Sequence, residues 1–177
     1  MDAKKFTEIK KEYDEFYRSL LRQGRLPMYS TQNGFWNASI DDEAFEAFMK
    51  IGLQRFRNFL DVGSGDGKIV LAASLFCKNA EGVEIDGFLH SKALEIRDKL
   101  KIKNAVFHNG DFFNHDFSKY DILFSAPDAP FGRGLESKLI KEMSGRLIVY
   151  GQHFQPHNLK KEGSFVVNGT LISVFSR

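Results

Sequence analysis

The sequence predicts an α/β domain with a doubly wound, mostly parallel sheet of seven strands, preceded by an amphipathic helix. Short apolar runs that favour strands alternate with helix-period runs between residues 58 and 150. A glycine-rich loop follows the first of these strands. Two further strand patterns near the end of the chain flank Asn168-Gly169, a dipeptide typical of a tight antiparallel hairpin.

The first expected element is an amphipathic helix over residues 4–23. Its apolar residues recur at spacings of three and four, which is typical of one buried helix face: Phe6, Ile9, Tyr13, Phe16, Tyr17, Leu20 and Leu21. Gly24 can end this helix, and an irregular stretch follows from Arg25 to Ala38. The apolar face can pack on the chain's own core or pair with a second copy, so a homo-oligomer through this helix is left open.

The remaining elements follow in order. Ser39 and Asp42 predict the start of a helix that ends near Gly52. The expected strands span 58–62, 80–85, 105–108, 120–125, 146–150, 164–167 and 170–175, and the expected helices span 68–78, 89–100 and 135–143. We therefore divide the chain into an N-terminal helix with a lid-like extension, residues 1–38, and an α/β core, residues 39–177.

Composition narrows the classes of function. Of 177 residues, 42% are hydrophobic and 27% are charged, with a formal net charge of +2. These values disfavour wholesale disorder and nucleic-acid binding driven by gross charge, but not a local basic patch. The single cysteine, Cys77, excludes an intramolecular disulfide and a Cys-rich zinc site. Residues 1–16 lack a secretory pattern, and no run reaches the ~20 apolar residues of a membrane span, so we expect a cytoplasmic protein with no membrane partner.

Carboxylates gather at one edge of the predicted sheet. Asp61 precedes the glycine loop, Glu84 ends the second core strand, and Asp111 follows the third; the loop reads Gly63-Ser64-Gly65-Asp66-Gly67. In a doubly wound sheet these positions meet where ligands bind. A pyrophosphate there would be repelled, because at ~4 Å and an effective dielectric constant of ~20 each like-charge contact costs about 4 kcal/mol before screening. A cationic compound that carries a ribose fits better, and S-adenosyl-L-methionine is such a compound.

Glu84 is the expected partner of the ribose. It lies 21 positions after Gly63, which is close to the spacing of ~20 residues expected for an acidic residue that accepts hydrogen bonds from ribose hydroxyls. Two charge-assisted hydrogen bonds would each contribute about 1.5–3 kcal/mol. The alternative is a carboxylate at a strand end that only faces water.

Three motifs carry a family resemblance. The run Phe59–Gly67 resembles the first motif of class I S-adenosylmethionine-dependent methyltransferases, which have a Rossmann-like fold. Gly82–Asp86 resembles their second motif and Asn109–Phe112 their third, and the resemblance covers about residues 40–177. The size and the glycine loop are also loosely similar to compact archaeal protein-lysine methyltransferases.

The resemblance implies roles for these residues. Asp61 and the loop from Gly63 to Gly67 would face the methionine end of the cofactor, and Glu84 would hold its ribose. Asp111 would bond the adenine amino group, with Ile85 and Phe112 flanking the ring. Ordinary core packing is the alternative for Ile85 and Phe112. We expect Ser125, at the end of the fourth core strand, to be a further cofactor contact.

The acceptor site is less defined by the sequence. Methyltransferases that act on base amino groups or on glutamine often carry Asn or Asp, two prolines and an aromatic residue after the fourth strand, and the chain departs from this pattern with Ser125-Ala126-Pro127-Asp128. Asp128 is the candidate contact to the nucleophile, or else a turn carboxylate. His153 is a candidate base. Pro156 breaks any helix that would align His153 with His157, so we expect no metal site there.

Trp36 is the single tryptophan and lies before the core. Tyr29 to Trp36 is predicted to form a lid, with Trp36 at the substrate entrance. The alternative is that Trp36 anchors the N-terminal helix to the core.

The resulting prediction is an S-adenosyl-L-methionine-dependent methyltransferase that acts on a nitrogen nucleophile, with protein lysine as the first choice of acceptor. RNA or a small molecule is the alternative acceptor. A non-catalytic S-adenosyl-L-methionine-binding module is a second class of function. A nucleotide-dependent oxidoreductase is a third, against which the glycine spacing and the carboxylates argue.

Overall fold

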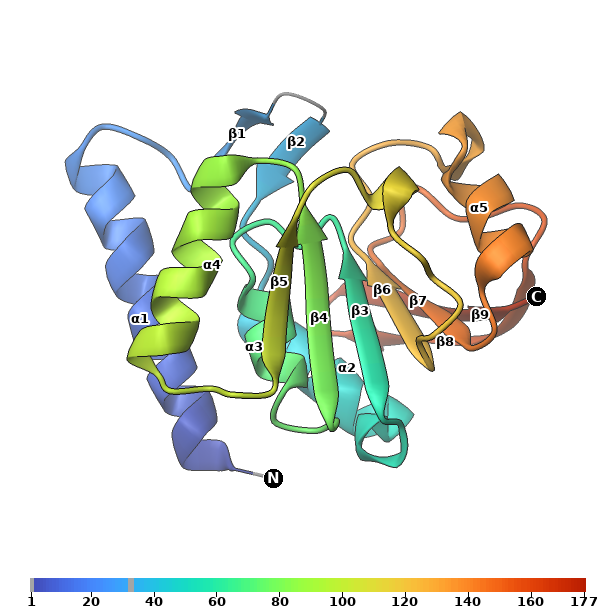
Figure 1. Ribbon diagram of the computed structural model, residues 1–177, viewed down its shortest axis with the longest axis horizontal. Coiled ribbons are helices and arrows are strands. Elements are labelled where there is room, and N and C mark those ends of the chain that lie inside the picture. Colours follow the sequence, from blue (N-terminus) through green and yellow to red (C-terminus); the bar gives the residue numbers. More distant parts are fainter. Residues whose placement is uncertain (1, 32–33) are drawn as a thin grey trace.

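The computed structural model describes residues 2–31 and 34–177, and it confirms the mostly parallel seven-stranded sheet with its C-terminal antiparallel hairpin (Figure 1). The strand order is β5-β4-β3-β6-β7-β9-β8. The strands are β3 (Asn58–Val62), β4 (Asn79–Glu84), β5 (Ala105–Asn109), β6 (Ile122–Ser125), β7 (Arg146–Tyr150), β8 (Lys160–Val167) and β9 (Thr170–Ser176). The first five pair in parallel, and β9 runs antiparallel to both β7 and β8.

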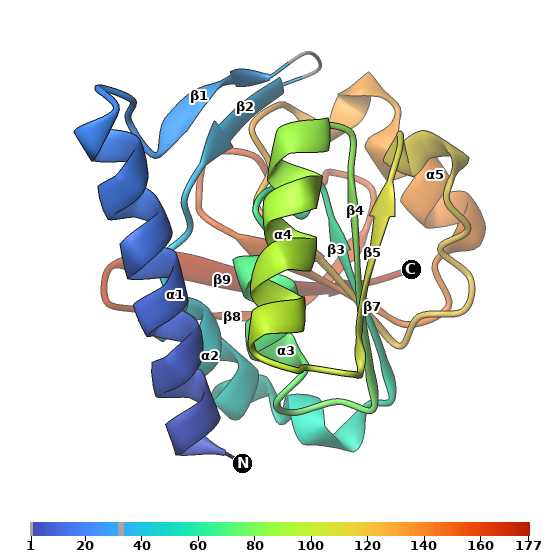
Figure 2. The ribbon, with the colours of Figure 1, turned by 60° about the vertical axis from the view of Figure 1, so that its left-hand side comes forward.

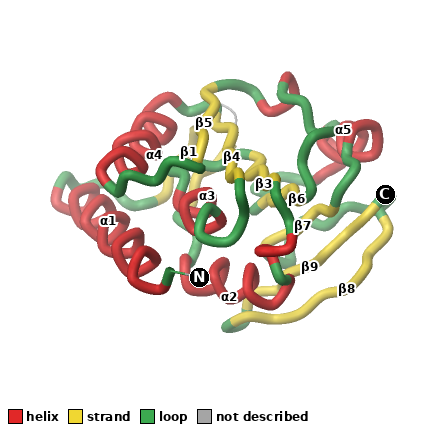
Figure 3. The backbone as a smooth tube through the Cα atoms, turned by 60° about the horizontal axis from the view of Figure 1, so that its bottom comes forward, coloured by secondary structure: helices red, strands yellow, loops and turns green. Residues whose placement is uncertain are grey.

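Helices cover the two faces of the sheet unequally. They are α1 (Ala3–Arg22), α2 (Asp41–Ile51), α3 (Lys68–Ala73), α4 (Gly87–Lys99) and α5 (Leu135–Glu142). Figure 3 shows α1 to α4 along one side and α5 on the other. Successive residues of a strand pack on opposite faces of the sheet. Phe59 belongs to the hydrophobic cluster between the sheet and α1 to α4, and Leu60 belongs to the cluster between the sheet and α5.

The N-terminal helix packs on its own chain. Asp2 caps it by accepting a hydrogen bond from the Lys5 amide at 3.0 Å. Its apolar face is buried at Phe6, Ile9, Tyr13, Phe16 and Leu20. An ion pair of 2.5 Å between Glu12 of α1 and Lys99 joins α1 to the end of α4. Figure 2 shows α1 lying beside α4. Most of the apolar face is therefore covered within one chain, whereas Leu21 is exposed.

The segment between α1 and α2 differs from the structure that the sequence predicts. Instead of an irregular stretch over Arg25–Ala38, strands β1 (Met28–Thr31) and β2 (Gly34–Asn37) pair antiparallel, with Tyr29 opposite Trp36. Tyr29, Phe35 and Trp36 lie on these strands, and aromatic residues favour strands.

Several element boundaries also differ. Ser39 does not cap α2, which begins at Asp41 without a side-chain cap and carries three acidic residues in its first turn, where the helix dipole favours them. The helix α3 ends at Ala73, five residues earlier than expected, and β8 begins four residues earlier, at Lys160. None of the described helices combines the length and the apolar character needed to cross a bilayer.

Candidate functional site

A cavity of about 750 Å³ lies at the carboxyl ends of the parallel strands. The β1–β2 hairpin, at the top of Figure 1, stands above these strand ends. The cavity is lined by most of the residues singled out from the sequence: Trp36, Asp61, Gly63, Ser64, Gly65, Asp66, Glu84, Ile85, Asp111, Phe112, Ser125, Asp128 and His153. Gly67 and Tyr29 are not among its lining residues.

The glycine loop needs its glycines for two different reasons. Gly63 and Gly65 have φ of +78° and +54°, a left-handed conformation that side chains rarely adopt. A Cβ at Gly63 would meet nothing within 4 Å, so the backbone borders open space that a ligand can enter. A Cβ at Gly67 would lie 2.5 Å from Cβ of Ala93 and 2.6 Å from the Phe107 ring. Gly67 therefore lets the loop pack closely on α4 and β5 rather than facing the cavity.

Glu84 is fixed by two backbone amides. Its Oε2 accepts from the Gly65 N–H and its Oε1 from the Asp86 N–H, each at 2.8 Å. Burial raises the pKa of Glu84, although these two hydrogen bonds oppose the rise. Each carboxylate oxygen keeps a second acceptor position, so the pair suits two neighbouring hydroxyls such as those of a ribose.

Asp61 is a buried carboxylate without a partner among the described residues. It is 3% exposed and lines the cavity. Burial, followed by the charges of Glu84 and Asp66, holds the pKa of Asp61 well above its usual range. A buried carboxylate in this position is stabilised by a cation and destabilised by any further anion.

Asp66 connects the glycine loop to α1. Its carboxylate accepts hydrogen bonds from the Tyr17 hydroxyl at 2.6 Å and from the Lys68 amide at 3.2 Å. The Tyr13 hydroxyl donates to the Asp66 carbonyl at 2.8 Å. The sequence places both tyrosines only in the apolar face of the helix, because their spacing gives no indication of what the hydroxyl groups contact. The Asp66 carboxylate is thus occupied within the protein.

The far wall of the cavity comes from the loops after β4 and β5. Ile85 and Phe112 are half-buried and line the cavity, and Phe112 also packs against the core cluster beneath α5. Asp111 accepts a hydrogen bond from the Phe113 amide at 2.8 Å, which caps a short 3-10 turn. The Ser64 hydroxyl is buried against Gly82 and has no hydrogen-bond partner among the described residues. Ser64 therefore lines the cavity with its other atoms.

Asp128 joins the loop after β6 to the hairpin. Its Oδ2 accepts from the Phe35 amide of β2 at 2.5 Å. A Cβ at Gly34 would lie 2.3 Å from the same oxygen, so only glycine permits this approach. His153 is exposed at the rim. Tyr150 also lines the cavity, and its hydroxyl donates to the buried carboxylate of Glu43, an arrangement that the sequence did not reveal.

Trp36 both lines the cavity and packs against α1. It is 7% exposed, and its ring lies 6.4 Å from the rings of Phe16 and Tyr17 and 5.4 Å from that of Tyr29. A Cβ at Gly65 would come within 2.7 Å of the indole, so the ring sits directly on the glycine loop. Part of the predicted lid from Tyr29 to Trp36, residues 32–33, lies outside the described residues.

Comparison with known proteins gives two kinds of match. Residues 55–168 match the family described as a methyltransferase domain. A release factor glutamine methyltransferase from Buchnera aphidicola subsp. Schizaphis graminum is 33% identical over 76 residues, which make up 42% of this chain. The matched stretch spans only 28% of that protein's length.

Solved structures share the fold at low identity. An RNA methyltransferase from Salinibacter ruber, in complex with S-adenosyl-L-homocysteine, superposes with a TM-score of 0.67 at 19% identity, covering 77% of this chain and 92% of that one. The tRNA (uracil-54, C5)-methyltransferase of Pyrococcus abyssi gives a TM-score of 0.65 at 14% identity, covering 84% of this chain and 44% of that one. At these identities the likeness establishes the fold alone.

Proposed function

The chain belongs to the methyltransferase domain family, and we propose that it transfers a methyl group from S-adenosyl-L-methionine to an acceptor held in the cavity below the β1–β2 hairpin. The observation that carries the proposal is the buried Asp61 carboxylate, unpartnered among the described residues, next to the open backbone of Gly63. A cationic adenosyl compound satisfies this carboxylate, whereas a diphosphate would add repulsion.

The residues present fit this cofactor along its whole length. Glu84 holds the ribose through the two free acceptor positions of its carboxylate. Ile85 and Phe112 form the apolar walls for the adenine, and Asp111 accepts from its amino group. Asp61 and the backbone of the glycine loop receive the methionine end, close to the indole of Trp36.

For methyl transfer, the protein mainly has to position the acceptor relative to the cofactor. The cofactor supplies a methyl group on a sulfonium, which is an activated leaving group. The chain must hold the acceptor in line with that methyl group and exclude water, and such placement supplies about 7–11 kcal/mol of the rate acceleration. Trp36 and the hairpin cover the glycine loop and give this exclusion.

The acceptor we propose is the amine of a protein lysine. The charged groups that line the cavity are the carboxylates of Asp61, Asp66, Glu84, Asp111 and Asp128 and the guanidinium of Arg133. This acidic lining attracts an ammonium group and repels the phosphates of a nucleic acid. Asp128 orients the amine at the mouth, and the exposed imidazole of His153 takes up the proton that a lysine must lose before attack.

The test is methyl transfer from S-adenosyl-L-methionine carrying a labelled methyl group, with the pure protein and a cell extract. We expect the label in the protein fraction and, after hydrolysis, in methylated lysine. Gly65→Val serves as the control that does not bind the cofactor. Label in RNA or in small molecules would overturn the lysine acceptor, and cofactor binding with no labelled product in any fraction would favour a non-catalytic binding module.

A further inference from the structure

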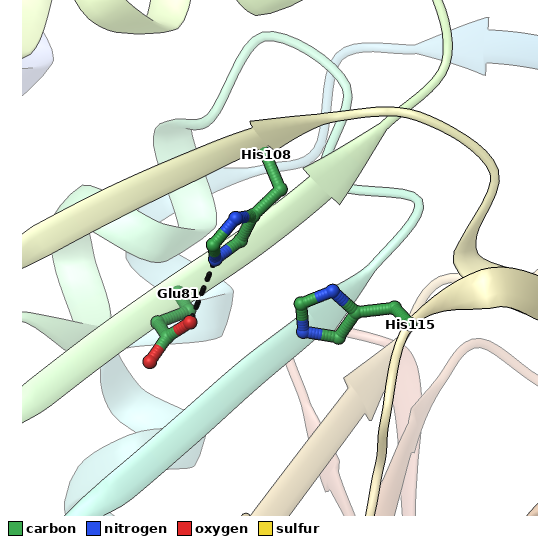
Figure 4. Close-up of side chains that lie close together, drawn as sticks. All are labelled: Glu81, His108 and His115. Carbon is green, nitrogen blue, oxygen red and sulfur yellow. Dashed lines mark hydrogen bonds and ion pairs between the residues drawn. The ribbon is translucent and has the colours of Figure 1, made fainter.

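A second cluster of chemically reactive side chains lies away from the methyl-transfer cavity. Glu81 of β4 and His108 of β5 project from the sheet face opposite α4, and His115 follows in the loop after β5 (Figure 4). This loop contains only a short 3-10 turn before β6 begins, so no long helix covers the two strands here. The three side chains are partly buried, and none of them lines the cavity.

The ligating atoms of the cluster already converge. Among the described residues this is the one group of three such side chains in which one ligating atom of each lies within 4.8 Å of the others. Nε2 of His108 is 2.7 Å from Oε2 of Glu81, and the two imidazole rings are 4.8 Å apart between centroids. In a tetrahedral zinc site with bonds of about 2.0–2.1 Å, neighbouring ligand atoms are about 3.3 Å apart. Small side-chain rotations therefore give this spacing.

Tyr120 supports the same three side chains. Its hydroxyl lies 2.8 Å from Oε2 of Glu81 and 2.8 Å from Nε2 of His115. A hydroxyl in this position can stay bonded to a ligand carboxylate from outside a metal site and hold its orientation. Tyr120 is 1% exposed, so its position is fixed by the core beneath α5.

The residue types of the cluster suit a cation, since one carboxylate and two imidazoles are ligands that zinc prefers. Lys119 opposes a cation here, because its Nζ lies 4.0 Å from Glu81, but its side chain is 52% exposed and free to turn toward water.

We infer that Glu81, His108 and His115 form a binding site for a divalent transition-metal ion of the zinc type, with two imidazoles, one carboxylate and water as ligands. The ion would tie the loop after β5 to strands β4 and β5. Because the same loop carries Asp111 and Phe112 at the cavity wall, the site would also brace that wall.

The test is calorimetric titration of Zn²⁺ into the full, tag-free chain after treatment with EDTA and removal of the chelator. We expect one ion per chain and a higher melting temperature with Zn²⁺. Glu81→Gln, His108→Ala and His115→Ala should each weaken binding by at least about 100-fold, because losing a ligand costs more than the 10–100-fold typical of its supporting groups. Lys119→Ala should tighten binding, since it removes the nearby positive charge.

The matched control is His157→Ala, because His157 is exposed and lies outside the cluster. It should bind Zn²⁺ as the parent chain does. Circular dichroism checks that each variant is folded, and Co²⁺ in place of Zn²⁺ reports four-coordinate geometry through its visible absorption. The inference is overturned if the parent chain shows no saturable binding at one ion per chain, or if the three ligand variants bind as well as His157→Ala. Neither result depends on methyl transfer.

Discussion

The two halves of the cavity are built in different ways. The half formed by the glycine loop and the ends of β3 and β4 consists of backbone groups and carboxylates that are almost completely buried, such as Asp61 and Glu84. The half formed by the β1–β2 hairpin and the loops after β6 and β7 includes exposed groups such as His153, and a hydrogen bond from the Phe35 amide to Asp128 joins the hairpin to the loop after β6. The first half is suited to one fixed ligand, whereas the second can admit different acceptors.

Gly65→Val should have the largest effect on the buried half. A branched side chain does not tolerate φ of +54° and would strike the indole of Trp36. We expect cofactor binding to fall below detection in calorimetry while circular dichroism still shows a folded chain. The control is Gly163→Val, since a Cβ at Gly163 meets nothing within 4 Å and its φ is not positive. Equal affinity in both variants would contradict this account of the loop.

Glu84→Ala tests the carboxylate of the buried half directly. Cofactor affinity should fall by about 10–100-fold, equivalent to ~1.4–2.7 kcal/mol. The reason is the loss of both ribose contacts and of the acceptor that fixes the Gly65 amide. Glu162→Ala is the control, because Glu162 lies on the edge strand β8, outside the cavity, and pairs with Arg146. An unchanged dissociation constant for Glu84→Ala would remove the ribose assignment.

Asp128→Asn probes the exposed half. The amide keeps an oxygen that can accept from Phe35 but loses the negative charge, so kcat/KM for the acceptor should fall roughly tenfold, as expected for one charge-assisted hydrogen bond. Cofactor affinity should stay the same, because Asp128 belongs to the other half. A loss of cofactor affinity in this variant would mean that the two halves are not separate.

The pH dependence of cofactor binding should show the smallest change. The raised pKa of Asp61 means that the free protein holds a proton there above the usual range of an aspartate. A cationic ligand prefers the ionised form, so affinity should rise severalfold with pH until Asp61 is ionised in the free protein, and then level off. In the absence of ligand the same group lowers stability as pH rises from its unfolded pKa through its folded pKa. Asp61→Asn should flatten the affinity profile, and a profile that falls with rising pH would contradict this account.

The sequence predicted the buried half far better than the exposed half. The strand, glycine loop and acid of the first half are contiguous or regularly spaced, so local rules locate them, as with Asp61 and Glu84. The hydrogen bonds from Tyr13 and Tyr17 to the loop join segments about 50 residues apart, and no local pattern encodes them. The same holds for His108 of β5, whose partner Glu81 lies on the neighbouring strand β4. The β1–β2 hairpin was not predicted, although Tyr29, Phe35 and Trp36 are residue types that favour strands.

The central claim is that the buried acids around the glycine loop accept a positively charged adenosyl compound and reject a diphosphate. Its most direct test is a pair of calorimetric titrations of the full chain, one with S-adenosyl-L-methionine and one with NAD. We predict saturable binding of one S-adenosyl-L-methionine per chain and no binding of NAD. Binding of NAD without binding of S-adenosyl-L-methionine would contradict the account.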